Sequence, residues 1–261
     1  MIIQIERAKE ARKNVAGVYI DLKKAFDTVN HELLLHKFYL LGVSGSVLSW
    51  FESYLSDRQQ FVKINESVSG KKIISHGVPR GSILGPILFL IYVNDIMELK
   101  LNSTVYLFVD DTALVCSADN YMHLQYFLSE DLQKLSRWMH KNRLTMNWDK
   151  SSFMLFGNDE YPVLQSIEVG NSRLNRAKSV KYLDLHIDEK LTWVQHINHV
   201  VNKIRPMSFI LFKLRNFLNR EQLLQLYYAY VHSRLSYLCI VWGRSSKKRF
   251  KKGACLTEEN S

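Results

Sequence analysis

The stretch Val105-Tyr-Leu-Phe-Val-Asp-Asp-Thr-Ala-Leu-Val-Cys116 decides the fold, because two apolar runs flank a pair of adjacent aspartates. Apolar runs of this length, rich in Val, Tyr, Phe and Leu, predict strands, and the short gap between them predicts a hairpin. Tight hairpin turns favour glycine, since their central residues often need a positive φ. Asp110 and Asp111 instead place two like charges side by side, which costs free energy unless a cation lies there.

The elements on either side of this hairpin follow the order strand, helices, two hairpin strands, helix, strand. We expect strands over 15–22 and 152–156, helices over 30–41, 47–55 and 121–141, and the hairpin over 104–117. Asn30 or Thr28 can cap the first of these helices. The helix over 121–141 has an apolar face made of Leu124, Leu128, Leu132, Leu135 and Met139. This order is the βαββαβ arrangement of a split βαβ fold. Asp21 then ends the first strand, and the aspartate pair joins the two central strands. Asp21, Asp110 and Asp111 can therefore be spatial neighbours although they are far apart along the chain.

The segment between the first helices and the hairpin, and the segment after residue 157, complete this outline. We expect a hairpin between 60–64 and 72–76, then a loop rich in glycine and proline over 77–86 that leads into an apolar helix. Short strands over 163–187 precede two helices between 192 and 242, so we place a domain boundary near 188–192.

The composition favours a polyanionic partner, although a merely soluble basic protein has the same character. The chain of 261 residues is 47% hydrophobic, and 35 Lys and Arg against 25 Asp and Glu give a net charge of +10. A basic excess of this size is typical of nucleic-acid-binding proteins. The basic run over 244–252 is read as part of a solvated tail.

Cysteine usage and the apolar runs predict an intracellular protein, in the nucleus or the cytoplasm, that does not enter a membrane. Cys116, Cys239 and Cys255 are far apart, which indicates neither a zinc knuckle nor a disulfide framework. The N-terminus is not a secretory signal. The longest apolar stretch, around 83–93, contains Gly85 and Pro86 and is too short to cross a bilayer.

The three aspartates suit one kind of chemistry. Nucleotidyl transfer requires neutralised phosphate oxygens and an activated attacking oxygen, and two divalent ions about 4 Å apart supply both. Hard cations such as Mg²⁺ prefer carboxylate oxygens and keep positions open for substrate. Asp21, Asp110 and Asp111 at the ends of rigid strands meet that requirement.

Five sequence blocks, in order, closely resemble the reverse transcriptases of non-LTR retrotransposons of the LINE type, which include the jockey-like elements. The blocks begin Tyr19-Ile-Asp-Leu, Gly77-Val-Pro-Arg-Gly, Phe108-Val-Asp-Asp, Asn142-Arg-Leu-Thr and Val180-Lys-Tyr-Leu. The resemblance covers about residues 1–243.

The resemblance implies an α+β fold, in which a polymerase palm with helices on one face of an antiparallel sheet precedes a mostly helical, thumb-like region. It implies a palm with partial fingers over 1–188, a thumb-like region over 189–243 and a disordered tail over 244–261. The implied activity is RNA-directed DNA synthesis onto a primer 3′-OH. The implied partners are an RNA template, a DNA primer, deoxynucleoside triphosphates and two Mg²⁺ ions, for which Mn²⁺ can substitute.

The family also implies roles for the metal ligands and for the general acid. Asp21 and Asp110 would ligate both ions, with the Leu22 carbonyl as an added ligand, and Asp111 would complete the acidic cluster. Lys150 matches the lysine that assists the leaving pyrophosphate as a general acid.

Further positions match groups that hold the nucleotide and the primer. Phe26 matches the bulky residue that excludes a ribose 2′-OH, although it also fits an ordinary core phenylalanine. Arg80 and Gly81 fall in the nucleotide-binding loop, and Tyr182 and Leu183 match the primer-gripping hairpin.

Three observations support alternatives. Relatives usually have Gln at Arg80 and Gly at Asp184, and this chain lacks their fingers region, endonuclease domain and cysteine-rich knuckle, as a fragment or decayed copy would. A catalytically inactive nucleic-acid-binding fragment is therefore an alternative. A viral RNA-copying polymerase is a weaker one, because Phe26 argues against it. His196 and His199 could form a metal pair, but a solvated or helix-packing face is favoured because no third ligand is evident.

Overall fold

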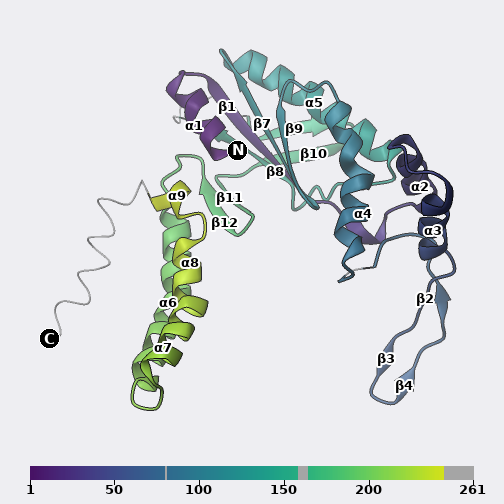
Figure 1. Cartoon of the computed structure of the whole chain (residues 1–261). Coiled ribbons are helices and arrows are strands. Elements are labelled where there is room, and N and C mark those ends of the chain that lie inside the picture. The colour runs from purple at the N-terminus through teal and green to yellow at the C-terminus, as the bar shows by residue number, and fades with distance from the viewer. Residues whose placement is uncertain (80, 158–163, 244–261) are drawn as a thin grey trace. The chain divides into compact units, whose positions relative to one another are not determined.

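The computed structural model describes residues 1–79, 81–157 and 164–243, and a six-stranded sheet is the core of the first of its two units. Its strands lie in the order β6-β7-β1-β8-β10-β9 (Figure 1). Their bounds are β1 (Asn14–Ile20), β6 (Thr104–Phe108), β7 (Asp111–Ala118), β8 (Ser152–Phe156), β9 (Ser166–Val169) and β10 (Ser172–Arg176). The elements confirm the expected α+β fold.

Two details of this sheet differ from the expectation. β8 and β10 are parallel, whereas the other neighbouring strands are antiparallel, so the sheet is mixed. The reason is that β9 and β10 form a hairpin whose second strand, not its first, pairs with β8. The aspartate pair joins β7 to the edge strand β6, and not two central strands.

Helix α5 (Tyr121–Lys141) packs its apolar face on one side of the sheet. The expected face of the helix is buried as Leu124, Leu128, Leu132, Leu135 and Met139. Alternate residues of the central strand β1, namely Ala16, Val18 and Ile20, belong to the same core. The side chains that face this core recur every second residue in β1 and every three or four residues in α5, as expected when a helix covers a sheet.

The other side of the sheet also carries a helix, which the expectation of helices on one face did not include. In α1 (Ile2–Glu10), the Gln4 side chain donates to the Thr104 hydroxyl at 2.9 Å and accepts from the Tyr106 hydroxyl. Tyr106 pairs with Ala113, whereas the adjacent Val105–Leu114 pair faces the α5 core. Successive side chains of a strand point to opposite faces, so α1 lies across the sheet from α5.

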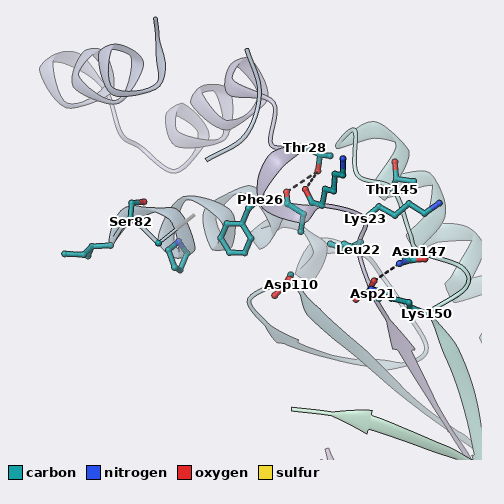
Figure 2. A pocket seen from close by; sticks show the side chains of 15 residues that line it. Asp21, Leu22, Lys23, Phe26, Thr28, Ser82, Asp110, Thr145, Asn147 and Lys150 are labelled. Carbon is teal, nitrogen blue, oxygen red and sulfur yellow. Dashed lines mark hydrogen bonds between the residues drawn. The ribbon is translucent and has the colours of Figure 1, made fainter. Parts of the chain in front are cut away.

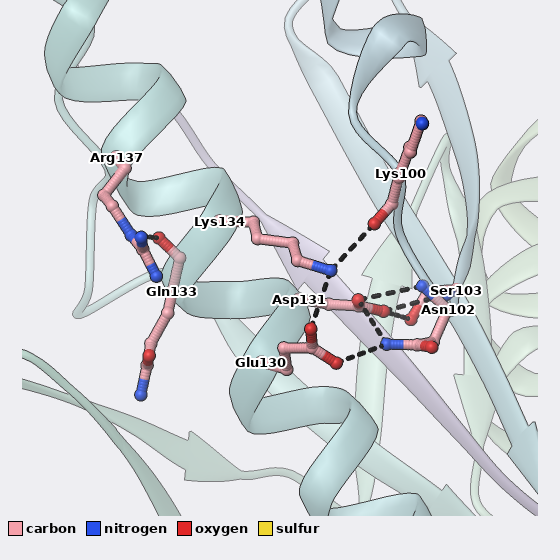
Figure 3. Close-up of polar contacts among 8 residues, drawn as sticks. All are labelled: Lys100, Asn102, Ser103, Glu130, Asp131, Gln133, Lys134 and Arg137. Atoms are coloured by element: carbon pink, nitrogen blue, oxygen red, sulfur yellow. Dashed lines mark hydrogen bonds and ion pairs between the residues drawn. The ribbon is translucent and has the colours of Figure 1, made fainter.

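A buried carboxylate ties α5 to the start of β6 (Figure 3). Asp131 is fully buried and accepts from the backbone N–H groups of Asn102 and Ser103, at 2.9 and 2.8 Å. It also accepts from the Ser103 hydroxyl at 2.5 Å and from the Asn102 side-chain amide at 3.1 Å. Four donors on one carboxylate satisfy its buried lone pairs and fix the chain that enters the hairpin.

The remaining elements of the first unit lie between β1 and β6. They are η1 (Ala25–Asp27), α2 (His31–Leu40), α3 (Gly45–Leu55), β2 (Gln59–Gln60), β3 (Lys63–Ile64), β4 (Ser67–Val68), β5 (Lys72–Ile73), α4 (Leu84–Val93) and η2 (Asn94–Glu98). Of the two expected caps of α2, Asn30 is the one that forms, since its side chain accepts from the Leu33 N–H at 2.9 Å. The β2–β5 and β3–β4 pairs make one long hairpin (Figure 1).

The chain divides into two units near Ala177 and Lys178, earlier than the boundary expected near 188–192. The second unit contains β11 (Ser179–Tyr182), β12 (Leu185–Asp188), α6 (Val194–Leu214), α7 (Arg220–Tyr227), a π-helix (Tyr228–His232), α8 (Ser233–Ser236) and α9 (Cys239–Trp242). β11 and β12 pair with each other, and β12 packs on α6. The hairpin therefore groups with the helices that follow it.

Within the described part of the chain, no helix combines the length and the apolar character needed to cross a membrane. The expected disordered tail, 244–261, lies outside the described residues.

Candidate active site

The register of the sheet brings the first strand to the aspartate pair. β1 and β7 are antiparallel, with Tyr19 opposite Ala113 and Ile20 opposite Thr112. Continuing this register by one residue places Asp21 opposite Asp111. The two carboxylates come from positions two residues beyond Tyr19 and two before Ala113, so both project on the face that lies away from the α5 core.

The turn that carries the pair holds a strained backbone. Phe108 pairs with Asp111, so Val109 and Asp110 form a two-residue loop. Val109 has φ +54°, which is a true outlier for a β-branched residue. Strain of this kind costs about 1–3 kcal/mol and occurs most often at functional sites. A strained valine, Val109, therefore occupies a turn position where glycine is usual.

A cleft of about 970 Å³ opens where these elements meet (Figure 2). Predicted site residues from four separate segments line it, namely Asp21, Leu22, Phe26, Gly81, Asp110 and Lys150. Asp111 is not among its lining residues. The structure therefore gathers two of the three aspartates, the candidate general acid and two candidate nucleotide contacts in one place.

Negative charges lie close together at the acidic side of the cleft. Burial, followed by the charges of Asp110 and Asp21, raises the pKa of Asp111 above that of an ordinary carboxyl. Within residues 1–79, 81–157 and 164–243, however, no three His, Cys, Asp or Glu side chains are arranged to hold a metal ion together. Asp21 and Asp110 offer hard carboxylate oxygens to the cleft, and Asp111 adds a third negative charge beside them. The chemistry of these donors fits a divalent cation.

Asp111→Asn should stabilise the fold at neutral pH, by about 2 °C in Tm. A raised folded-state pKa means that the ionised carboxylate disfavours the folded state, so stability falls as pH rises through that pKa. The advantage of the variant should therefore be full at pH 7 and vanish below about pH 4, where an unfolded carboxyl is also protonated. Thermal unfolding followed by circular dichroism at both pH values tests this, and an equal advantage at both would contradict it.

Phe26 lies at the edge of the cleft with its ring stacked on a core residue. It is half-buried, and its ring centroid is 5.1 Å from that of the fully buried Phe89. Phe26 therefore packs in the core through one face and also lines the cleft, while its exclusion of a ribose 2′-OH stays a prediction.

The glycine-rich loop is fastened to the segment that carries Phe26. The Val78 N–H donates to the Phe26 carbonyl at 2.8 Å, and the Gly77 N–H donates to the Val29 carbonyl at 2.7 Å. Gly77 has φ +92°, and a Cβ there would lie 3.0 Å from the backbone of Asp27, so no larger residue fits without a shift. His31 contacts the Gly77 carbonyl through Nε2 at 2.8 Å, which adds a further tie between α2 and the loop.

Arg80, which the sequence assigned to nucleotide binding, lies outside the described residues. Tyr182 and Leu183, the predicted primer grip, belong to the second unit. Leu183 and Asp184 link β11 to β12 with φ of +48° and +58°, a turn that normally favours Asn-Gly. The Asp184 carboxylate lies 2.7 Å from Lys181 Nζ and 3.6 Å from Lys203 Nζ, so its charge is partly compensated.

His196 and His199, on α6, lie close to a third histidine that sequence reasoning did not identify. The ring centroid of His186, on β12, lies 4.7 Å from that of His199 and 6.3 Å from that of His196. The trio is nevertheless not arranged to share a metal ion in the described part of the chain. The burial of His196 agrees with the helix-packing part of the favoured alternative, a solvated or helix-packing face.

One contact in the cleft involves a residue that the sequence did not single out. The Asn147 side-chain amide donates to Asp21 Oδ2 at 2.9 Å (Figure 2). Asn147 lies three residues before Lys150 in the same loop. The sequence feature that could have pointed to Asn147 is therefore its closeness to Lys150, the candidate general acid.

A family model described as reverse transcriptase (RNA-dependent DNA polymerase) matches residues 1–187. The chain belongs to the reverse transcriptase family. It is 26% identical over 256 residues to the RNA-directed DNA polymerase from mobile element jockey of Drosophila melanogaster, covering 94% of this chain and 28% of that protein. It is 27% identical over 262 residues to a probable RNA-directed DNA polymerase from transposon BS of the same species, covering 95% and 28%. The chain thus spans about a quarter of the length of these relatives.

A telomerase from Candida tropicalis, solved in complex with a fragment of telomeric RNA, shares the fold. The TM-score is 0.52 at 13% sequence identity, and the match covers 98% of this chain and 45% of the telomerase chain. At this identity the likeness concerns the fold alone.

Proposed function

We propose that this chain is the polymerising domain of an RNA-directed DNA polymerase from a non-LTR retrotransposon. The observation that carries the proposal is the shared cleft, in which Asp21 and Asp110 lie with Lys150 and Phe26. Membership of the reverse transcriptase family and the likeness to two Drosophila element polymerases support it.

The acidic side of the cleft would hold the catalytic cations. Asp21 and Asp110 would bind them through carboxylate oxygens, Leu22 would add its backbone carbonyl, and Asp111 would complete the negative field. Two Mg²⁺ ions, or Mn²⁺ in their place, would when bound neutralise phosphate charge and favour ionisation of the primer 3′-OH.

The remaining residues of the cleft would bind and orient the substrates. Lys150 would donate a proton to the leaving pyrophosphate. Phe26, held on Phe89, would occupy the space that a ribose 2′-OH needs. Gly81, at φ +78° with nothing within 4 Å of a Cβ built on it, would let the incoming nucleotide approach the backbone closely. Most of the acceleration would come from positioning and electrostatics.

The nucleic acid would be an RNA template paired with a DNA primer. The names of the relatives describe RNA-directed synthesis of DNA, and the net charge of +10 favours a polyanion. Tyr182 and Leu183 would hold the primer strand at the β11–β12 turn.

Primer extension by the purified 261-residue chain tests the function. The assay supplies a labelled DNA primer on an RNA template, deoxynucleoside triphosphates, and Mg²⁺ or Mn²⁺. Incorporation above the Asp110→Ala background supports the proposal. An extension rate equal to that background, with the primer–template still bound, supports the alternative of an inactive nucleic-acid-binding fragment. The absence of a three-ligand metal cluster among the described residues favours that alternative.

Phe26→Val should relax sugar selection by about tenfold or more, because a smaller side chain leaves room for a 2′-OH. The measurement is the ratio of kcat/KM for deoxynucleotide against ribonucleotide incorporation. Phe61→Val is the matched control, since Phe61 is 53% exposed on the long hairpin. An unchanged ratio in a folded Phe26→Val variant would leave Phe26 as a core residue only.

A further inference from the structure

A single loop, residues 145–151, grips the backbone on both sides of Asp21. The Lys23 N–H donates to the Thr145 carbonyl at 2.8 Å, and the Asn147 N–H donates to the Asp21 carbonyl at 2.8 Å. The Asp21 N–H donates to the Ser151 hydroxyl at 3.0 Å. Asp21 therefore leaves the sheet at a point where its main chain is already fixed.

The side chain of Asp21 is fixed by the same loop. The Asn147 amide donates to Oδ2 at 2.9 Å, across 126 positions of sequence, and Asn147 is half-buried (Figure 2). A carboxylate without such a bond rotates about its last torsion, where rotamer preference is weak. With Oδ2 engaged, the orientation of Oδ1 is set as well.

Asn147 also fixes the turn that carries Lys150. Its backbone carbonyl accepts from the Lys150 N–H at 3.2 Å and from the Ser151 N–H at 2.8 Å. Asn147 and Lys150 both line the cleft. One residue thus contacts the Asp21 carboxylate through its side chain and orders the Lys150 turn through its main chain.

Like charge makes this restraint necessary. Asp110 and Asp111 follow β6 at the neighbouring turn, and the β1–β7 register, continued by one residue, places Asp21 opposite Asp111. Without a restraint, a free Asp21 carboxylate would turn away from the other two. A neutral amide donor holds it in place and adds no charge to the cleft.

We propose that Asn147 is a positioning residue, which aims the Asp21 carboxylate at a divalent cation and keeps Lys150 in register with it. The proposal rests on the proposed function, in which Asp21 is a metal ligand. Residues that orient a metal ligand typically contribute 10–100-fold to metal affinity. The rival role is that Asn147 only shapes the turn.

The test is an EPR titration of the full chain with Mn²⁺ alone. Asn147→Leu keeps a side chain of similar size and all main-chain bonds but removes the donor, so Mn²⁺ affinity should fall about tenfold or more. Asn147→Gln retains the amide and should recover most of that loss. Asn94→Leu, the same exchange at an exposed site outside the cleft, should bind like the wild type.

Asp21→Asn distinguishes a failure of the positioning role of Asn147 from a failure of the metal role of Asp21. If it loses Mn²⁺ affinity while Asn147→Leu binds like the wild type, the positioning role is overturned and the metal role of Asp21 stands. If Asp21→Asn also binds like the wild type, the proposed function fails and the inference fails with it. Each variant is first checked by thermal unfolding, and Asn147→Ala, which also removes the amide donor, serves as the test if Asn147→Leu does not fold.

The Mn²⁺ dependence of primer extension provides a second readout, because a purely turn-shaping role predicts no rescue by added metal. High Mn²⁺ should restore much of the extension rate of Asn147→Leu, because a misaimed ligand weakens metal binding without removing it. Asp21→Asn should not be rescued. A loss of rate in Asn147→Leu that persists at saturating Mn²⁺ would contradict the proposal.

Discussion

Asp110→Ala should lower the rate of primer extension by about 10³-fold, and Asp21→Ala should do the same. Both carboxylates line the cleft, and their charge is the feature that would hold divalent cations against a triphosphate. Removing one leaves the site with too little negative charge to bind two cations. The measurement is single-nucleotide addition to a labelled primer at saturating deoxynucleotide and Mg²⁺.

A matched control and a double variant sharpen this prediction. Asp119 lies beyond the far end of β7, with its side chain 85% exposed and 3.6 Å from Lys13 Nζ, so Asp119→Ala should retain the wild-type rate. Asp21→Ala combined with Asp110→Ala should be little slower than either single variant, because residues that act as one unit are not additive. Additive losses, or extension by Asp110→Ala at the wild-type rate, would refute the assignment of the ligands.

The parts of the fold that follow from periodicity were predictable from the sequence. The apolar positions of α5 recur every three or four residues, and all five expected core positions are buried. The strand order of a split βαβ fold places Asp21 near the aspartate pair, and the register confirms that Asp21 follows directly on the pairing with β7. Pattern and topology are properties of whole segments, so they are visible in one sequence.

Single contacts between distant segments were not predictable. The Asn147–Asp21 bond, the parallel β8–β10 pair and the position of α1 opposite α5 each join segments through a few atoms. Neither periodicity nor composition records such contacts. Asp111 shows the same limit at the site, because being adjacent to Asp110 in sequence did not place it in the lining of the cleft.

Asp184 and Val109 stand at turn positions where glycine is usual, and their backbone angles differ in what they explain. Asp184 occupies a position with φ +58°, which favours glycine, and aspartate is one of the few other residues that tolerate it. Val109 at φ +54° has no such tolerance. The first departure therefore has a local reason, whereas the second concentrates strain beside Asp110, a proposed metal ligand.

Asp131→Ala should lower the free energy of unfolding by about 3 kcal/mol or more, which corresponds to a fall in Tm of about 6–12 °C. The carboxylate is fully buried and accepts from both the Asn102 and Ser103 N–H groups (Figure 3). Alanine would leave these donors and the Ser103 hydroxyl without their acceptor, in a place that water reaches poorly. Thermal unfolding by circular dichroism measures the change.

Two variants decide whether the hydrogen bonds, and not helix content or charge, are responsible. Glu130→Ala changes the adjacent, more exposed residue of α5 and should shift Tm little. Asp131→Asn keeps the shape of the side chain but turns one oxygen into an NH₂ donor. If that NH₂ faces Ser103, the hydroxyl can rotate to accept from it, whereas the Ser103 N–H cannot. Asp131→Asn should therefore lose about half as much stability as Asp131→Ala, and a Tm equal to that of the wild type would mean that the backbone donors find other acceptors.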